Sequence, residues 1–387
     1  MKLFVLVSRI PYPLEKGDKL RAYHQMKDLA KRHEIVLCCL TDKKADPAAI
    51  AHLETFCEEV IVVKLNKALQ LARLGAALIS SRPFQVHYFF QRKALRLIKK
   101  TIDRTNPDHI YCQLIRCSEY LKDIYHIPKT LDYMDALSKG MERFSHTAPW
   151  YLKRFAKLEA KRLTQYEHLI FEYFDHHSII SQQDKDLIVN PNRSKIKVIP
   201  NGVDLDFFSP RISENTYSVV FTGNMSYAPN VDGALFLAND IMPLVRKKLP
   251  TATLMLAGAN PSGKVKALAS EYTTVSGWMD DIRDAYAQAT VFVAPMRIGT
   301  GLQNKLLESM SMGIPSITSP LANNALNAAP NEEVLLGETA QEFADHIVRL
   351  IENEELRESM SEKGRAFVQE NYSWEAAGGL LERLLNH

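Results

Sequence analysis

Short runs of apolar residues alternate with amphipathic stretches along most of this 387-residue chain. In the first half, the apolar runs predict β-strands at Leu3–Val7, Ile35–Leu40, Val60–Val63, His109–Cys112, Lys129–Leu131 and His177–Ile180. The first amphipathic stretch, Lys19–Arg32, predicts a helix because its apolar residues recur at the spacing of one helix face. Strands that alternate with helices in this way are typical of a parallel sheet with helices on both faces.

The alternation is interrupted in the middle of the chain and then starts again. The interruption is the segment IKVIPNGVDLDFFSP, in which a short strand leads into Pro-Asn-Gly and an irregular stretch that ends at Pro210. After it, the pattern predicts strands at Ser218–Thr222, Thr253–Leu256, Thr273–Val275, Val291–Ala294 and Ser316–Thr318, and helices at Asn230–Leu249, Asp280–Ala289 and Ser373–Asn386.

We therefore predict an α/β protein with two doubly wound, Rossmann-like domains that face each other across a cleft. The expected N-terminal domain comprises residues 1–200, the linker 201–215 and the C-terminal domain 216–370. The last segment, 371–387, begins with Ser373 as a helix N-cap and is expected to form a helix that crosses back to the N-terminal domain. Ligands of such sheets bind at the carboxyl ends of the strands, so the pattern indicates a location but no chemistry.

Amino-acid composition indicates the cellular compartment of the protein and argues against some classes of binding partner. With 46% hydrophobic and 24% charged residues, the chain can bury two cores, and its net charge of +3 is too small to indicate nucleic acid. The five cysteines form no CxxC pair and no disulfide-like framework, which favours buried thiols in a reducing compartment. The start MKLFVLV is too short an apolar run for a signal peptide, and no stretch approaches the ~20 apolar residues of a membrane-spanning helix. We expect a cytoplasmic protein that is either soluble or peripheral on the inner face of the membrane.

The segment VFVAPMRIGTGLQNKLLESMSMGIPSI, Val291–Ile317, carries the clearest chemical signal. An apolar strand meets a Gly-Thr-Gly turn, and the turn opens a helix that bears Lys305 and Glu308. Backbone N–H groups and the positive end of a helix dipole would then converge on a small space, an arrangement suited to phosphate. Lys305 is placed to meet a diphosphate and Glu308 to meet ribose hydroxyls. The alternative is an ordinary turn followed by a Lys–Glu pair on a helix surface.

Three segments resemble the GT-B glycosyltransferases, specifically glycosyltransferase family four: SRIPYPLEKGDKLR, VIPNGVDLDFF and VFVAPMRIGTGLQNKLLESMSMGIP. The finer pattern, FTGNMSYAPNVDGALFL with GTGLQNKLLE, is similar to bacterial sugar transferases of exopolysaccharide and exosortase-associated gene clusters. The resemblance implies a nucleotide-diphosphate-sugar donor in the C-terminal domain, an acceptor in the N-terminal domain, and transfer with retention of anomeric configuration. It also implies that neither a metal ion nor a cofactor takes part.

The chain departs from the family pattern at several positions. Family members often carry two glutamates at the donor site, and one of them matches Glu308, whereas the position of the other is Thr300. The family's Arg and Lys after the first C-terminal strand correspond to Asn224 and Pro229, and its N-terminal active-site histidine corresponds to Gln113. These losses leave a chain without catalytic activity as an alternative.

Our preferred interpretation is that Arg297 and Lys305 replace the missing positive charge, while Glu308 orients the nucleotide ribose. These three residues are the predicted catalytic residues. The expected donor-binding residues are Gly17, Arg21, Gly223, Asn224, Trp278, Met279, Gly299, Thr300, Gly301, Leu302, Gln303 and Asn304, and the expected acceptor-side residues are Gln113, Arg116 and Asp135. Structural alternatives are an ion pair for Arg297, a solvated helix position for Lys305, a plain turn for Gly17, a surface position for Arg21, a packing role for Trp278 and a helix cap for Asp135.

The stretch from Val60 to Ile102 contains no Asp or Glu. Its cations are Lys64, Lys67, Arg73, Arg82, Arg92, Lys93, Arg96, Lys99 and Lys100, and its apolar residues include Leu69, Leu71, Leu74, Leu78, Ile79, Phe84, Tyr88, Phe89 and Phe90. Such a mixture favours an anionic membrane surface, at about 1 kcal/mol per cation near that surface. We expect residues 60–102 to hold the protein where a lipid-linked acceptor presents its head group. Two ordinary amphipathic helices with solvated charges are the alternative.

The sequence thus predicts a retaining, metal-independent hexosyltransferase that acts on a glycan or lipid-linked glycan in cell-surface polysaccharide synthesis. A sugar-nucleotide epimerase of the same fold is a second enzymatic interpretation, although it needs acid–base residues where the expected sites are neutral. A scaffold that binds a sugar nucleotide without turnover is the interpretation from a different class.

Overall fold

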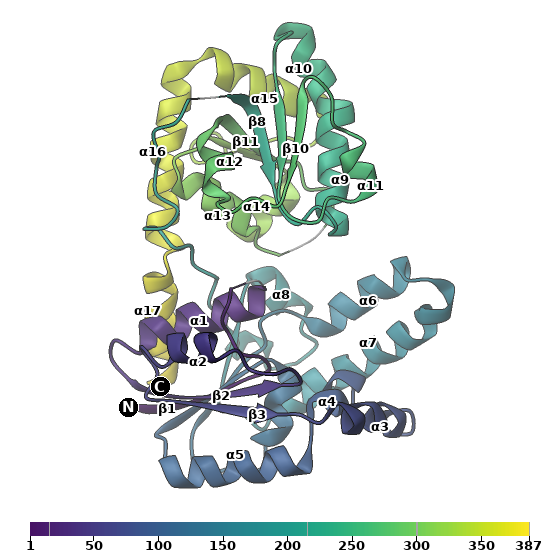
Figure 1. Ribbon diagram of the computed structural model, residues 1–387, viewed down its shortest axis with the longest axis vertical. Helices are drawn as coiled ribbons and strands as arrows, with labels where there is room; N and C mark the ends of the chain where they lie inside the picture. The colour runs from purple at the N-terminus through teal and green to yellow at the C-terminus, as the bar shows by residue number, and fades with distance from the viewer. Residues whose placement is uncertain (15, 215, 299–300, 387) are drawn as a thin grey trace. The chain divides into compact units, whose positions relative to one another are not determined.

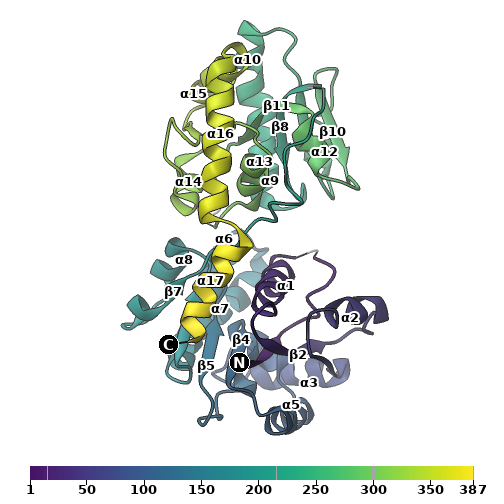
Figure 2. The same cartoon turned by 90° about the vertical axis from the view of Figure 1, so that its left-hand side faces the viewer.

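A computed structural model describes residues 1–14, 16–214, 216–298 and 301–386 of the chain. The chain divides into two compact units, one made of Met1–Pro200 with Ala377–His387 and the other of Asn201–Ala376 (Figures 1 and 2). Each unit has its own parallel sheet with helices packed on it.

Within the described residues, the sheet of the first unit has seven strands in the order β3-β2-β1-β4-β5-β6-β7. The strands are β1 (Lys2–Val7), β2 (Glu34–Thr41), β3 (Glu59–Lys64), β4 (His109–Gln113), β5 (Lys129–Asp132), β6 (His176–Ile179) and β7 (Lys197–Val198). They pair in parallel, and β1 lies between β2 and β4, with Leu3 opposite both Ile35 and His109. Strands β1 and β2 carry continuous buried apolar runs, Leu3–Val7 and Ile35–Leu40, as expected for strands that helices cover on both faces.

Helices lie on both faces of this sheet. They are α1 (Gly17–Leu29), α2 (Pro47–Leu53), α3 (Lys67–Ala77), α4 (Phe84–Phe89), α5 (Arg92–Thr105), α6 (Leu137–Thr147), α7 (Trp150–Phe171) and α8 (Gln182–Leu187), with 3₁₀ turns at Ile115–Tyr120 and Arg193–Lys195. Figure 1 shows α1 and α2 on one face and α5 on the other, while α6 and α7 form a hairpin that extends beyond the sheet. Helix α5 turns Ala94, Ile98 and Ile102 into the core.

The second unit repeats the same strand order, β10-β9-β8-β11-β12-β13, in the part of the chain that is described. Its strands are β8 (Tyr217–Thr222), β9 (Leu254–Ala257), β10 (Thr273–Gly277), β11 (Ala289–Ala294), β12 (Ser316–Thr318) and β13 (Leu335–Leu336). In both sheets the second and third strands lie on one side of the first strand, and the fourth and later strands lie on its other side. Two doubly wound sheets of this order confirm the predicted Rossmann-like α/β fold.

The helices of the second unit are α9 (Ala228–Phe236), α10 (Met242–Lys248), α11 (Gly263–Lys266), α12 (Arg283–Ala287), α13 (Asn304–Ser311), α14 (Pro320–Leu326), α15 (Ala340–Glu352) and α16 (Glu354–Asn371). The single helix expected at Asn230–Leu249 is divided by a π-helical segment, Leu237–Ile241, between α9 and α10. Pro243 in the first turn of α10 explains the division, because proline has no N–H to continue the α-helical hydrogen bonds.

The last helix, α17 (Trp374–Leu385), begins where the sequence places its N-cap. The Ser373 hydroxyl accepts a hydrogen bond from the Ala376 N–H at 3.0 Å. From Ala377 onward the helix belongs to the first unit, where Glu382 pairs with Arg32 at 2.8 Å. A Cβ built on Gly378 would lie 1.9 Å from a carboxylate oxygen of Asp28, so this glycine lets α17 lie close against α1. None of the helices in the described part of the chain has the length and apolar character needed to cross a membrane.

Candidate functional site

Three glycines occupy the carboxyl edge of the second sheet. Gly223 follows β8, Gly258 follows β9 and Gly277 ends β10, with φ of +150°, +132° and +71°. A Cβ built on Gly258 would lie 2.0 Å from the carbonyl oxygen of Gly223, so only glycine allows these two turns to pack. The turns are also joined by a hydrogen bond of 3.1 Å from the Gly258 N–H to the Gly277 carbonyl. Glycine at these positions therefore lets the turns pack closely, and lets the side chains of Asn230 and Lys305 lie against Gly223.

Lys305 lies directly against this glycine edge. It is the second residue of α13, only 9% of its surface is exposed, and its Nζ donates to Asn230 Oδ1 at 2.5 Å. The same Nζ lies 4.4 Å from the centre of the Phe221 ring and 3.0 Å from a Cβ built on Gly223. Burial lowers the pKa of Lys305 to about 7, and the neighbouring Glu308 only partly offsets this effect. The solvated alternative for Lys305 is wrong, since the side chain is packed inside the unit.

Glu308 lies one helical turn after Lys305 and is anchored on one side only. The Tyr286 hydroxyl donates to Glu308 Oε2 at 2.7 Å and lies 2.7 Å from the Thr222 hydroxyl. Among the described residues, Oε1 of Glu308 has no hydrogen-bond partner. Burial raises the pKa of Glu308, while the Tyr286 hydrogen bond and Lys305 oppose that rise. The fixed carboxylate can accept a hydrogen bond from a ligand hydroxyl through Oε1.

Arg297 follows β11 and is held by an acidic neighbour. Its Nε and Nη2 donate to the two carboxylate oxygens of Asp232 at 3.0 and 2.7 Å, and its guanidinium lies 4.2 Å from the Phe236 ring. The side chain remains 48% exposed. The structure thus places Arg297 in the ion pair that sequence analysis left as its alternative. Asp232 and an approaching anion would compete for this guanidinium.

The remaining predicted donor-binding positions of this unit differ in what they contact. Asn224 is exposed, and its side chain accepts hydrogen bonds from the Ser226 N–H and hydroxyl, so it forms a local turn. Trp278 is 75% exposed, which contradicts the packing alternative, whereas Met279 packs against the core. Between the glycine turn and α13, Gly301 has open space around its Cβ position, Leu302 packs against the core, Gln303 donates to the Gly301 carbonyl, and Asn304 begins the helix. The predicted Gly299 and Thr300 lie outside the described residues.

In the first unit, the predicted acceptor-side residues lie after β4 and β5. Gln113 is buried and donates through Nε2 to the Asp18 carbonyl at 3.0 Å. Arg116 is partly exposed, its guanidinium lies 5.3 Å from the Phe89 ring, and burial lowers its pKa. Asp135 is exposed and does not cap α6, because Ser138 at the start of that helix donates instead to a glutamate of α7. The helix-cap alternative for Asp135 is therefore wrong.

Gly17 and Arg21 both lie on α1. Gly17 is its first residue, and no atom of the described residues lies within 4 Å of its Cβ position, so its contact with the donor stays a prediction. Arg21 is fully buried and donates to both Asp132 oxygens, at 2.7 and 3.2 Å, and to the Ile199 carbonyl at 2.8 Å. The expectation that Arg21 binds the donor, and the alternative of a surface arginine, are both wrong. Arg21 joins α1 to β5 inside the unit, because a buried guanidinium needs a paired carboxylate.

Sequence analysis missed three contributors to the site, Phe221, Asn230 and Tyr286. Asn230 lies in the first turn of α9, where its Nδ2 donates to the Asn224 carbonyl at 3.0 Å while Oδ1 accepts from Lys305. In the sequence, Asn230 was marked only by its place after Pro229, which is a weak signal for such a role. Tyr286 and Phe221 fell within ordinary apolar patterns, and nothing local distinguished them from core residues.

The described residues offer neither a grouped set of metal ligands nor an exposed cysteine. In the described ranges, no three His, Cys, Asp or Glu side chains are grouped so that they could hold a metal ion. All five cysteines are buried and free. Burial raises the pKa of Cys38 and Cys57 to about 12, so these thiols are unreactive near neutral pH.

Comparisons with known proteins concern the fold and the C-terminal domain. Residues 216–353 match the family described as Glycosyl transferases group 1. The chain is 23% identical to an uncharacterized 44.6 kDa protein in the cps region of Klebsiella pneumoniae, over 96% of both chains. It is 28% identical to the UDP-Gal:alpha-D-GlcNAc-diphosphoundecaprenol alpha-1,3-galactosyltransferase of Escherichia coli, over 36% of this chain and 40% of that protein.

Among solved structures, the chain is similar to HepE of Anabaena in complex with UDP-glucose, with a TM-score of 0.68 and 15% identity over 100% of both chains. At this identity the likeness shows the fold. The chain therefore has the GT-B fold, and its residues 216–353 match the domain described as Glycosyl transferases group 1.

Proposed function

We propose that this chain is a retaining, metal-independent glycosyltransferase of the family-four type. It transfers a hexose from a nucleotide-diphosphate sugar to a glycan or lipid-linked glycan in cell-surface polysaccharide synthesis. The observation that carries the proposal is the buried Lys305 against the Gly223 turn, with the anchored Glu308 one helical turn away.

In this proposal the diphosphate binds at the glycine edge, beside the side chains of Lys305 and Asn230 that lie against Gly223. The ammonium of Lys305 neutralises the charge that develops on the leaving diphosphate, and the N-terminus of α13 adds to this effect. Glu308 Oε1 accepts a hydrogen bond from a ribose hydroxyl, while the hydrogen bond from Tyr286 to Oε2 holds the carboxylate in place. Arg297 contributes only where the diphosphate displaces Asp232 from its guanidinium.

The transfer step needs no protein nucleophile. The acceptor oxygen forms a bond to the anomeric carbon on the face that the diphosphate leaves. The bond from that carbon to the diphosphate breaks, and the acceptor proton passes to the departing phosphate oxygen. Because cationic side chains and backbone dipoles meet the diphosphate charge, the proposal assigns no step to a metal ion.

The names of similar proteins support the donor and acceptor classes. HepE was crystallised with UDP-glucose, and the E. coli relative is named for transfer from UDP-Gal to a sugar on diphosphoundecaprenol. The Klebsiella relative is named for the cps region. These names favour a UDP-sugar and a lipid-linked acceptor for this chain.

A lipid-linked acceptor brings the membrane surface into the proposal, and the structure changes where we place that surface. Helix α5, at the end of the 60–102 stretch, buries its apolar side and keeps its charges outside, as the solvated alternative describes. Exposed apolar residues lie instead just after the end of α3 and in the first turn of α7. Leu78 and Ile79 are 67% and 95% exposed, and Trp150 and Tyr151 are 83% and 64% exposed.

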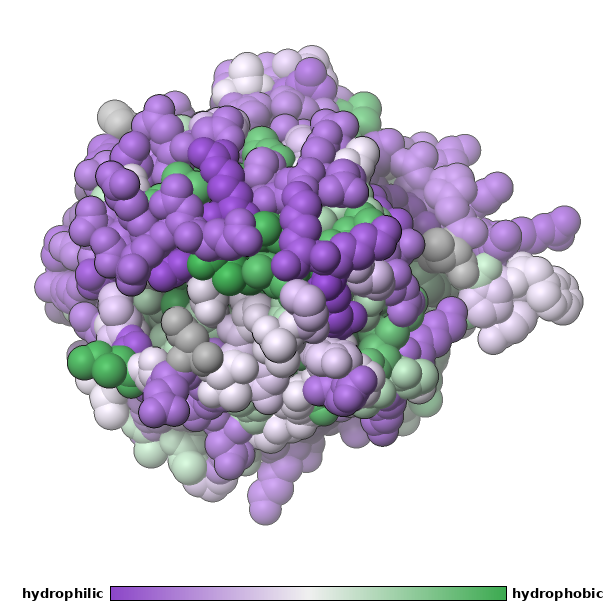
Figure 3. Space-filling view, turned by 90° about the horizontal axis from the view of Figure 1, so that it is seen from above, coloured by the Kyte–Doolittle hydropathy of each residue, from purple (hydrophilic) through white to green (hydrophobic). Residues whose placement is uncertain are grey.

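We call the surface around Leu78, Ile79, Trp150 and Tyr151 the α3–α7 surface. The Arg162 guanidinium on α7 donates to the carbonyl of Ala77, the last residue of α3, at 2.8 Å, and the ring of Phe84 on α4 lies 4.6 Å from that of Phe155 on α7. Lys153, Arg154, Lys157 and Lys161 lie among the exposed apolar residues of α7. The face in Figure 3 is hydrophilic over much of its area, with pale and hydrophobic groups between the hydrophilic ones. We propose that the α3–α7 surface rests on anionic lipid.

The donor test begins with thermal shift against UDP, GDP, ADP and their hexose derivatives, because a bound ligand raises the apparent stability. Slow release of nucleoside diphosphate without an acceptor is then expected from a transferase. Lys305→Ala should reduce donor binding or turnover at least several-fold, whereas Lys248→Ala, an exposed lysine of the same unit, should not. Tight binding with no turnover on any acceptor would favour the scaffold, and an unchanged rate in Lys305→Ala would refute the role of Lys305.

The membrane test is flotation with vesicles of phosphatidylcholine alone or mixed with phosphatidylglycerol. We expect flotation only with the anionic mixture, and its loss in the double variant Ile79→Ser, Trp150→Ser. Tyr125→Ser is the matched control, since Tyr125 is 75% exposed elsewhere in the same unit. Equal flotation with both vesicle types would exclude the electrostatic part of the proposal.

A further inference from the structure

The first unit contains a hollow that the proposed donor site does not use. It lies at the carboxyl ends of β1, β2 and β3 and has a volume of about 300 Å³. Its apolar walls are Ile10, Leu40, Ala49, Leu65 and Phe89, and its polar lining includes Arg9, Tyr12, Thr41, Asp42, Gln70 and Tyr88. Aromatic and aliphatic walls with a few polar groups are typical of a small-molecule site.

Gln70 is the unusual member of this lining. Its side chain is only 2% exposed, yet neither its amide nitrogen nor its amide oxygen has a hydrogen-bond partner among the described residues. A buried carboxamide without partners is costly, because it has lost its bonds to water and gained none in return. Gln91, a buried glutamine in the same unit, shows the usual case: its Oε1 accepts from the Asn66 N–H and its Nε2 donates to the Asn66 carbonyl.

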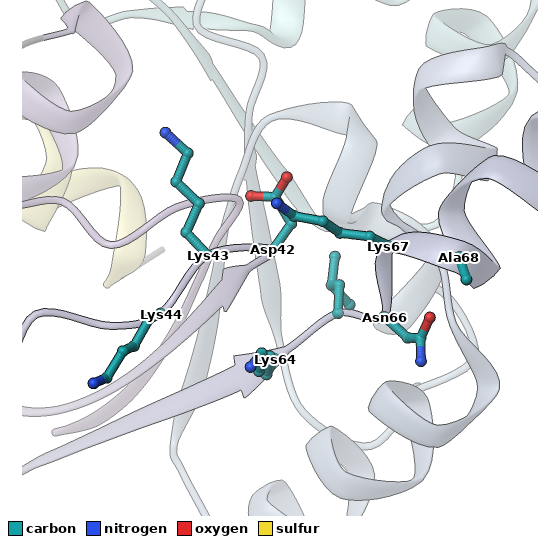
Figure 4. A pocket seen from close by; sticks show the side chains of 8 residues that line it. Asp42, Lys43, Lys44, Lys64, Asn66, Lys67 and Ala68 are labelled. Carbon is teal, nitrogen blue, oxygen red and sulfur yellow. The ribbon is translucent and has the colours of Figure 1, made fainter.

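A second, wider hollow of about 620 Å³ shares Asp42, Lys43, Lys44 and Leu65 with the first. Figure 4 shows its lining, in which Lys43 and Lys44 come from the loop after β2, Lys64 from the end of β3, and Lys67 from the start of α3. The one acidic residue of the described lining is Asp42, and its carboxylate lies beside the end of Lys67, while Lys43 and Lys44 extend away from it (Figure 4). Lys67 and Ala68, in the first turn of α3, also line this wider hollow.

We infer that the two hollows together bind a saccharide that carries a phosphate or diphosphate, with the sugar in the hollow at Gln70 and the anion over the four lysines. The Gln70 side chain can donate a hydrogen bond through Nε2 to a sugar hydroxyl and accept one from a sugar hydroxyl through Oε1. The inference deepens the proposed function, on which it rests, by naming Gln70 as the residue that reads the acceptor sugar. The same chemistry fits a free sugar phosphate and the head group of a lipid-linked sugar.

A pair of glutamine variants tests whether Gln70 is kept for a ligand. Gln70→Leu removes a buried amide without partners, so we expect the Tm to stay the same or to rise by about 2–4 °C. Gln91→Leu removes two hydrogen bonds and should lower the Tm. A fall in the Tm of Gln70→Leu similar to that of Gln91→Leu would show a structural role and overturn the inference.

Binding is then measured by saturation-transfer NMR with glucose 1-phosphate, galactose 1-phosphate, N-acetylglucosamine 1-phosphate, methyl glucoside and inorganic phosphate. We expect at least one sugar 1-phosphate to bind more tightly than both methyl glucoside and inorganic phosphate. Gln70→Leu should weaken that binding roughly three- to tenfold, the effect of one lost hydrogen bond. Binding of phosphate alone as strong as that of every sugar phosphate, or no binding by any of them, would overturn the inference.

A short-chain prenyl diphosphate sugar separates the two sources of the ligand. Tighter binding of this compound than of the matching sugar 1-phosphate would assign the site to a lipid-linked head group, and equal binding would assign it to a free sugar phosphate. Donor hydrolysis in Gln70→Leu is the separate readout. Normal hydrolysis with lost sugar-phosphate binding supports both proposals. Sugar-phosphate binding without any donor binding would refute the proposed function alone.

Discussion

The affinity for a nucleotide-diphosphate sugar should fall as the pH rises from about 6 to about 9, because Lys305 is a buried amine. In the unliganded protein its pKa is lowered from 10.5 to about 7 by burial against Phe221 and the glycine edge. A diphosphate beside the ammonium favours the charged form and raises the pKa again. Binding above pH 7 therefore takes up a proton.

The size of the effect follows from the pKa. With a pKa of about 7, roughly nine-tenths of the unliganded protein carries the Lys305 charge at pH 6, about a tenth at pH 8 and about a hundredth at pH 9. If only the charged form binds, the Kd rises about tenfold for each pH unit above 7, which is about 1.4 kcal/mol per unit.

Fold stability depends on the same group with the opposite sign. The folded-state pKa of Lys305 lies below its unfolded value of 10.5, so the unfolded chain binds more protons between about pH 7 and pH 10.5. The cost of burying the charge is thus fully present below pH 7 and is relieved as the pH rises through that window. Weaker donor binding at pH 8 to 9 therefore cannot be attributed to Lys305 loosening the fold.

Isothermal titration calorimetry with UDP-glucose checks this prediction, since a diphosphate with both ends esterified does not titrate in this range. Titration at pH 8 in two buffers of different ionisation enthalpy should show uptake of about 0.9 proton by the wild-type protein. Lys305→Met should bind weakly with no proton uptake, while Lys248→Met, which alters an exposed lysine, should match the wild type. A wild-type Kd that stays constant from pH 6 to pH 9 would refute the reasoning.

Two further predictions concern buried contacts. Gly258→Ala should lower the free energy of unfolding of the second unit by on the order of 3 kcal/mol, because its Cβ would lie 2.0 Å from a carbonyl oxygen and the backbone φ is +132°. Gly263→Ala is the control, since the space around Gly263 is open, and it should change the free energy of unfolding measured in urea by less than about 1 kcal/mol. Arg21→Met should cost about 3–5 kcal/mol in urea unfolding because it leaves the carboxylate of Asp132 buried without its cation, and a loss below about 1 kcal/mol would show that the pair is dispensable.

Much of the second unit's site could be located from the chain itself. The strand at Val291–Ala294, the glycine turn and the helix with Lys305 and Glu308 are contiguous in sequence, so their spacing alone predicts where they lie. Gly223 was found for the same reason, since it follows an apolar strand. The state of these side chains could not be predicted, because the burial of Lys305 depends on Asn230, which is 75 positions away.

The hypothesis for the membrane surface shows the same division. A stretch without acidic residues was visible from 60 to 102, but its periodicity does not tell which helix faces the core. The structure buries one side of α5 and exposes apolar residues after α3 and on α7, which lies outside that stretch. Only packing against other elements decides which of several amphipathic helices has no partner.

The sequence by itself determined the two doubly wound sheets, because the period of apolar positions is a local property that each strand and helix carries in its own residues. It also determined which turns bear glycine and which helix bears the Lys–Glu pair. The tertiary structure decided which charged groups meet: Arg21 pairs with Asp132 across 111 positions, and Glu308 receives its hydrogen bond from Tyr286 across 22. Which side chains meet depends on the order in which the strands lie side by side in each sheet. The local sequence around each residue does not specify that order.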